Sequence, residues 1–243
     1  FIAQGLAEEL ENRGYEVNFI SKSNDEDKFN IDCDVDVIIS LVNSYNIDKI
    51  KVKNNLVIKI AWILNWPEWW INKSYFESYD LVLCSNSRSL HYINENSGYE
   101  AQLLAVATNP EKFNPDVKSR EEFECDYIFA GNDWHDEREI SEILNPDEIP
   151  YKFKIYGKRW QNFENLEKYN MGHQLYEIMP EVYASTKIII DDATDLTEVP
   201  SGVNGRIFDG LASGKLVITN GEIGAKELFG DKLPVYHDAD SLK

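Results

Sequence analysis

Residues 201–219 read SGVNGRIFDGLASGKLVIT and combine a glycine-containing loop, a helical pattern over residues 203–212 and a buried strand over residues 216–219. Gly202 and Gly205 carry no side chain, so the backbone there can approach a ligand closely. The free N–H groups of a first helical turn can then hold an anion. Loop, helix and strand in this order predict an α/β fold with a parallel sheet.

Two charged residues of this stretch have two interpretations. Arg206 lies in the first turn of the expected helix, where it can face an anion, and Asp209 could accept hydrogen bonds from ribose hydroxyl groups. The stretch also fits a plain loop and helix capped by Ser201, with an Arg206–Asp209 surface pair that contributes a few tenths of a kcal/mol. Spacing alone leaves both open, and the absence of GxGxxG means that there is no dinucleotide fingerprint.

Helical and strand patterns alternate along most of the chain, which predicts a doubly wound α/β architecture. The expected strands are continuously apolar and β-branched, as in parallel sheets covered on both faces. They lie at residues 17–20, 35–42, 56–63, 81–84, 103–106, 127–130, 153–156, 188–190 and 216–219. Helices are expected at residues 69–77, 87–96, 137–144, 174–184, 203–212 and 225–229, after a first apolar stripe over residues 2–10.

The alternation is interrupted near residues 107–122, which hold two prolines, mixed charges and little apolar content. Such a stretch is typical of a linker between domains. We therefore expect two Rossmann-like domains, residues 1–110 and 111–243, that face each other across a cleft. Their ligands would lie beyond the carboxyl ends of the strands. Because Phe1 falls within a helical pattern, we expect a trimmed chain that lacks the first strand of its N-terminal domain.

The composition excludes several classes of partner. The 243 residues carry a formal charge of −19, which argues against nucleic acid and against broad adhesion to anionic membranes. A few local Lys and Arg residues could still hold a small anion. Cys33, Cys84 and Cys125 lie far apart without a CxxC pair, so a reducing, cytoplasmic location is the default. No apolar run is long enough to span a bilayer, and no signal peptide is visible.

Three segments resemble one enzyme family. They are SGVNGRIFDGLASGKLVITNGEIGAKELFGD at residues 201–231, LLAVATNPEKFNP at 103–115 and DYIFAGNDWHDEREI at 126–140. They resemble GT-B fold glycosyltransferases, more narrowly the group-1-like, spore-maturation (CgeB-like) family. The resemblance covers nearly the whole chain and is more specific in the C-terminal half. It implies a nucleotide-sugar donor, such as a UDP- or GDP-sugar, bound mainly by the C-terminal domain.

The resemblance assigns the donor ribose to Asp209, within a donor-binding stretch that includes Ser201, Gly202, Val203, Asn204 and Arg206. Many relatives have a second acidic residue eight positions before the first, where this chain has Ser201. Glu198 is the acidic residue of the loop that could substitute.

Other expected donor contacts also follow strands. Gly131 and Asn132 could present N–H groups to the pyrophosphate. The segment that contains Gly172 and His173 resembles the nucleobase pocket of relatives, although a lone histidine is more often structural.

Gly157, Lys158 and Arg159 follow the expected strand at residues 153–156. Two adjacent cations are conspicuous in so acidic a chain. They could neutralise a diphosphate leaving group, so we assign Lys158 and Arg159 as catalytic and Gly157 as donor-binding. The alternative is a solvated basic turn.

Four of the six tryptophans lie between Trp62 and Trp70. We expect Trp62 and Trp70 to pack in the core, and Asn65 and Trp66 to bind the acceptor, because aromatic faces stack on sugar rings. Glu68 could orient or deprotonate an acceptor hydroxyl group. Surface tryptophans also suit a partner or peripheral membrane contact.

The acidic loop at residues 191–195 raises the question of Mg²⁺ or Mn²⁺. GT-B relatives usually bind the diphosphate without metal, so we expect no metal and no cofactor besides the donor. We expect a solvated acidic loop in which Asp192 or Thr194 touches the donor. Of the histidines, His135 is the one to test.

The function expected from these residues is transfer of a sugar to an acceptor hydroxyl group, in cell-surface glycan or glycoconjugate synthesis. The acceptor is a glycan, a lipid-linked glycan or a protein, and the resemblance points to a metal-independent reaction that retains anomeric configuration. One alternative is a catalytically degenerate GT-B protein that binds or senses nucleotide-sugars. Another is an unrelated two-domain protein, such as a periplasmic-type binding protein or a nucleotide-sugar epimerase.

Overall fold

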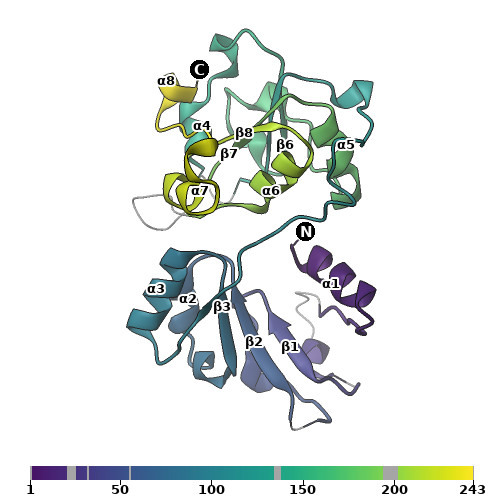
Figure 1. The fold of residues 1–243 in the computed structure, drawn as a ribbon, viewed down its shortest axis with the longest axis vertical. Helices are drawn as coiled ribbons and strands as arrows, with labels where there is room; N and C mark the ends of the chain where they lie inside the picture. Colours follow the sequence, from purple (N-terminus) through teal and green to yellow (C-terminus); the bar gives the residue numbers. More distant parts are fainter. Residues whose placement is uncertain are drawn as a thin grey trace. The chain divides into compact units, whose positions relative to one another are not determined.

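The computed structural model describes residues 2–20, 26–31, 33–54, 56–133, 138–193 and 202–242. The chain divides into two compact units, Phe1–Val106 and Ala107–Lys243. Each unit is built on its own four-stranded parallel sheet (Figure 1). Among the described residues, no helix is both long enough and apolar enough to cross a membrane.

The N-terminal unit has the strand order β1-β2-β3-β4, with every neighbouring pair parallel. Its strands are Val37–Ser40, Ile58–Ile63, Leu81–Cys84 and Gln102–Leu103, and its helices are α1 (Ile2–Asn12), α2 (Pro67–Ile71) and α3 (Ser87–Asn96). Ile47, Ile63, Cys84 and Ile93 are fully buried in its core. Trp62 and Trp70 are buried as predicted, and the Trp62 Nε1 donates a hydrogen bond to the Leu104 carbonyl at 3.0 Å.

Two expected elements of this unit differ from the structure. Residues 17–20 form no strand, because no neighbouring strand in the described part of the chain supplies their hydrogen bonds, and Phe19 is largely exposed. The helix expected at residues 69–77 begins earlier, because Pro67 occupies its first position, and it ends at Ile71. A separate 3₁₀ turn follows at Phe76–Ser78.

The C-terminal unit has the strand order β6-β5-β7-β8, again entirely parallel. In chain order the strands are β5 (Tyr127–Ala130), β6 (Phe153–Tyr156), β7 (Ile188–Asp191) and β8 (Leu216–Thr219). The helices are α4 (Glu139–Ile143), α5 (Met179–Ala184), α6 (Gly205–Ala212), α7 (Glu222–Phe229) and α8 (Ala239–Leu242). All four strands predicted for this half of the chain are present.

Apolar side chains cover both faces of this second sheet, as its continuously apolar strands predict. Ile128 and Ile189 face one core, which also contains Ile207 of α6. Phe129 and Ile190, their sequence neighbours, face the other core, which includes Ile140 of α4. The alternation of strand side chains between faces therefore anchors helices on each side and brings all four carboxyl ends to one edge.

The contact of α6 with the sheet depends on a glycine. A Cβ at Gly210 would lie 2.7 Å from Val217 Cγ2 and 2.8 Å from Ile189 Cδ1. We predict that Gly210→Ala lowers the free energy of unfolding by about 1–3 kcal/mol, through overpacking. Gly205→Ala, in the same helix with open space around it, should stay within about 0.5 kcal/mol of wild type. Urea denaturation of both variants measures the difference, and equal values would contradict the packing argument.

Candidate functional site

Short polar turns follow all four strands of the C-terminal sheet. Residues 131–133 follow β5 and residues 157–159 follow β6, while Asp192 follows β7 and Asn220 follows β8. In open parallel sheets, ligands bind beyond the carboxyl ends of the strands. This carboxyl edge is therefore the candidate functional site of the unit.

The turns after β5 and β6 are in direct contact through a glycine. Gly157 has a φ of +150°, and a Cβ there would lie 2.0 Å from the Gly131 carbonyl oxygen. The Trp160 Nε1 donates to the same oxygen at 2.7 Å, and the Lys158 N–H donates to the Asn132 Oδ1 at 2.9 Å. A side chain at Gly157 would separate the two turns, so glycine is required at this position.

The side chains of Lys158 and Arg159 are exposed at this edge, beyond the end of β6. Arg159 has a φ of +75° and is one of two non-glycine residues with positive φ in the described part of the chain. Such conformations cost free energy and are concentrated at functional sites. The structure thus places two exposed cations where an anion could bind.

The expected backbone contacts are only partly available. The Gly131 N–H donates to the Tyr156 carbonyl at 2.8 Å, so it continues the sheet and does not point toward a ligand. Gly172, with a φ of +75°, lies beside the β6 turn, because its carbonyl accepts the Gly157 N–H at 3.0 Å. His173 follows it and is exposed. The segment predicted to face the nucleobase is therefore joined to the turn that carries the cations.

Arg206 is committed to a buried ion pair. Its Nη1 lies 2.5 Å from the Asp191 Oδ1, and its Nε donates to the Ala130 carbonyl at 2.6 Å. The guanidinium also lies over the Phe129 ring, 4.5 Å from the centroid. Its side chain is 8% exposed and Asp191 is fully buried. Arg206 therefore joins α6 to the ends of β5 and β7, and the expected surface pair with Asp209 is not what occupies it.

Asp191 and Asp192 are both completely buried, so the prediction of a solvated acidic loop is wrong for them. Asp191 also accepts hydrogen bonds from Asn204 Nδ2 at 3.0 Å and Thr219 Oγ1 at 2.7 Å. Burial raises the pKa of the Asp192 carboxyl, and the charge of Arg138 opposes that rise. Local side chains replace the solvent that the sequence pattern suggested.

Asp209 is held by a residue that sequence analysis did not single out. The Thr108 hydroxyl donates to the Asp209 Oδ1 at 2.5 Å, although the two residues lie 101 positions apart. Burial raises the pKa of Asp209 from 3.8 to about 6, while this hydrogen bond and the Arg206 charge lower it. No sequence signal marked Thr108, which lies in the stretch interpreted as a linker.

Several predicted residues lie elsewhere or outside the described residues. Gly202, Val203 and Asn204 precede α6 and are half-buried, and the Asn204 amide is bonded to Asp191. Outside the described residues lie Ser201, Glu198, His135 and Thr194. Among the described residues, no group of three or more His, Cys, Asp or Glu could hold a metal ion. The prediction of no metal remains untested.

The predicted acceptor residues belong to the N-terminal unit. Asn65 and Trp66 follow β2, and Glu68 lies in the first turn of α2. Asn65 is exposed, whereas Trp66 and Glu68 are half-buried. These three residues thus lie at the carboxyl edge of their own sheet, as predicted from their place after a strand.

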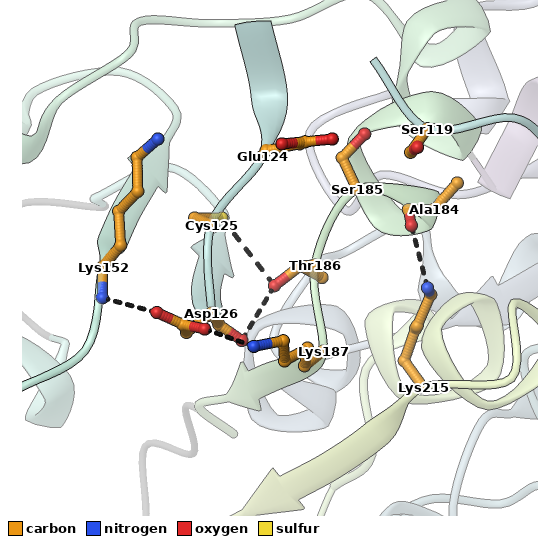
Figure 2. Close-up of a pocket in the computed structure, with 10 residues that line it drawn as sticks. All are labelled: Ser119, Glu124, Cys125, Asp126, Lys152, Ala184, Ser185, Thr186, Lys187 and Lys215. Carbon is orange, nitrogen blue, oxygen red and sulfur yellow. Dashed lines mark hydrogen bonds and ion pairs between the residues drawn. The ribbon is translucent and has the colours of Figure 1, made fainter. Parts of the chain in front are cut away.

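A surface hollow of about 490 Å³ lies at the amino edge of the C-terminal sheet (Figure 2). Lys152 and Lys187 precede strands β6 and β7, and Asp126 precedes β5. The Lys187 Nζ lies 2.6 Å from the Asp126 Oδ1, and the Lys215 Nζ donates to the Ala184 carbonyl at 2.9 Å. Most of these groups bond one another, and the edge is not the one that binds ligands in such sheets, so we place the candidate site at the carboxyl edge.

Comparison with known proteins identifies the class. Residues 137–243 match a protein family described as glycosyl transferase-like. The fold is similar to that of AviGT4, a glycosyltransferase involved in avilamycin A biosynthesis, at 14% identity and a TM-score of 0.57; the match covers 86% of this chain and 62% of that chain. A glycosyltransferase from Rickettsia africae matches at 15% identity and a TM-score of 0.56, over 99% of this chain and 68% of that one.

A third similar structure is TarM of S. aureus in complex with UDP, α-GlcNAc-glycerol and fondaparinux. It matches at 12% identity and a TM-score of 0.54, over 79% of this chain and 43% of that one. No curated protein sequence matches the chain. The fold is that of the GT-B glycosyltransferases, and the C-terminal part carries a glycosyl transferase-like domain. The spore-maturation family remains a prediction.

The buried Arg206–Asp191 pair generates a stability prediction. We expect Arg206→Ala to lower the free energy of unfolding by about 3–5 kcal/mol, because it leaves the Asp191 carboxylate buried without its cation. Arg13→Ala is the control, since Arg13 pairs with Glu9 on an exposed helix face and should cost less than about 0.5 kcal/mol. Chemical denaturation measures both variants. Equal effects would show that the Arg206 pair behaves as a surface pair.

Proposed function

We propose that the protein is a glycosyltransferase that moves a sugar from a nucleotide-activated donor to an acceptor hydroxyl group. The observation that carries the proposal is the carboxyl edge of the C-terminal sheet. There, two glycine turns in contact present Lys158 and Arg159, and Arg206 joins the same edge to the helix that carries Asp209. The family match of residues 137–243 supports it.

The proposed donor is a UDP- or GDP-sugar. Lys158 and Arg159 bind its diphosphate, Asp209 accepts hydrogen bonds from its ribose, and the segment at Gly172 and His173 lies along its base. A diphosphate leaving group gains negative charge as the glycosidic bond to the donor breaks. Cations that are already in place stabilise that charge without reorganisation, which is the largest contribution a protein commonly makes to such a reaction.

The proposed acceptor site lies in the N-terminal unit. Glu68 orients or deprotonates the attacking hydroxyl group, and Asn65 and Trp66 bind the acceptor. The acceptor is a glycan, a lipid-linked glycan or a protein, with cell-surface glycan synthesis as the proposed role. The resemblance supports a metal-independent reaction with retention at the anomeric carbon. The sparse cysteines support a cytoplasmic location.

Turnover with a panel of UDP- and GDP-sugars tests the proposal. The expected result is release of free nucleoside diphosphate, at an equal rate with and without EDTA. Loss of turnover in EDTA would contradict metal independence. Donor binding without release would indicate a nucleotide-sugar binding module instead, and the absence of both binding and release would refute the proposed function.

The exposed cations generate a second test. We expect Lys158→Ala and Arg159→Ala each to lower kcat/KM for the donor by about tenfold to a hundredfold, the usual effect of removing a hydrogen bond to a charged group. Both residues are exposed, so the free energy of unfolding should stay near that of wild type. Lys152→Ala is the matched control, because Lys152 lies at the amino edge of the same sheet. Full activity in both site variants would remove their assignment.

Asp209 generates a prediction about pH. Its carboxylate forms as pH rises through its pKa of about 6, so affinity for UDP or GDP should increase across that pH and then level off. Thr108→Val removes the hydrogen bond that lowers this pKa, so the midpoint should move to higher pH. Thr108→Ser keeps the hydroxyl group and should behave like wild type. Calorimetric titration across a pH series measures the midpoint, and an unchanged midpoint in Thr108→Val contradicts the assignment.

A further inference from the structure

The tryptophans near β2 separate into a core pair and a surface pair. Trp62 and Trp70 are buried, whereas Trp66 and Trp69 stack on each other with ring centroids 4.9 Å apart and planes 27° apart. The Trp69 side chain is 47% exposed even though Trp66 covers part of it. Two large apolar rings therefore meet at the surface of the N-terminal unit, at the carboxyl edge of its sheet.

The backbone conformation at Trp66 is costly. Its φ of +54° and ψ of +59° lie in the left-handed region, which is rare for a bulky residue. The following Pro67 disfavours helical conformations of either hand at Trp66 and favours an extended one. Such residues persist only where the surroundings hold them, here with a hydrogen bond from the Trp69 N–H to the Trp66 carbonyl at 3.0 Å. A surface ring pair maintained against this cost points to a binding role.

Polar groups with spare capacity lie in the same turn. Asn65 is exposed and Glu68 is half-buried. Across the ranges that the structure describes, neither the Asn65 amide nor the Glu68 carboxylate has a hydrogen-bond partner in the protein. We call Asn65, Trp66, Glu68 and Trp69 the tryptophan platform. It combines an apolar face with one amide and one carboxylate.

This combination matches the chemistry of a sugar ring. A pyranose has an apolar face of C–H groups that can lie on an indole ring, and a rim of hydroxyl groups that donate to carboxylates and exchange hydrogen bonds with amides. An anionic membrane fits less well, because the platform carries a carboxylate and the chain has a charge of −19. A nucleic acid base is disfavoured for the same reason.

We infer that the tryptophan platform binds a pyranose ring, with Trp69 as a stacking residue, and that the acceptor is therefore a saccharide. Binding of the saccharide follows from the platform alone. Its role as the acceptor rests on the proposed function. The inference selects one of the three acceptor classes, since the sugar ring and not a lipid tail or a peptide is what the N-terminal unit recognises.

Titration with soluble trisaccharides tests the inference. Maltotriose, cellotriose, chitotriose and mannotriose are added to the protein, and the indole N–H signals are followed by NMR. We expect at least one trisaccharide to shift the signals of Trp66 and Trp69. Trp69→Ala should weaken that binding by about tenfold or more, and Trp69→Phe should restore part of it because an aromatic face remains.

The control variant is Tyr15→Ala, which removes another exposed aromatic ring from the same unit and should leave binding unchanged. The urea midpoint of each variant shows that it remains folded. Two results would overturn the inference: no trisaccharide binds, or Trp69→Ala binds as wild type does. Trp69-dependent binding to phosphatidylglycerol vesicles without saccharide binding would also overturn it, in favour of a membrane contact.

The experiment separates this inference from the proposed function. Saccharide binding without release of nucleoside diphosphate from any donor would leave the platform in place and refute the transferase. Release from a donor without Trp69-dependent saccharide binding would leave the transferase in place and refute the platform. UDP and GDP affinity should be the same in wild type and Trp69→Ala, because the donor residues belong to the other unit.

Discussion

The buried ion pair between Arg206 and Asp191 determines how the C-terminal unit is assembled at its carboxyl edge. Asp191 ends β7 with no exposed surface, and its carboxylate is satisfied by Arg206, Asn204 and Thr219. A buried carboxylate without these partners would cost several kcal/mol. The pair therefore requires α6 to begin where it does, against the ends of β5 and β7, which in turn positions Asp209 one helical turn later.

This constraint determines which charges are available for function. A guanidinium that already serves Asp191 and the Ala130 carbonyl has limited capacity for a donor phosphate. Lys158 and Arg159 are in the opposite situation, exposed on a turn that Gly157 holds against Gly131. The protein thus uses one cation to build the edge and presents two others beyond it. A catalytic role for preorganised charge depends on such a division.

Much of the fold could be predicted from the sequence, and for a specific reason. The strands at residues 81–84, 127–130, 153–156 and 216–219 coincide with the observed ones, because continuous apolar runs between polar turns have few other stable placements. The same approach placed a strand at residues 17–20, which have the composition of a strand but no partner among the described residues. Composition describes a strand's own side chains, whereas pairing depends on a neighbour.

The candidate site shows where the sequence alone reaches its limit. The sequence determined the parallel α/β architecture and the turns that meet at the carboxyl edge, because hydrophobic pattern and glycine position are local properties. Tertiary structure decided which polar groups are buried and paired: Asp191 and Asp192 are inside, Arg206 is bonded to Asp191, and Thr108 is bonded to Asp209 across 101 positions. Such pairings depend on which distant segments the packed cores bring together, and no local pattern of residue types encodes that.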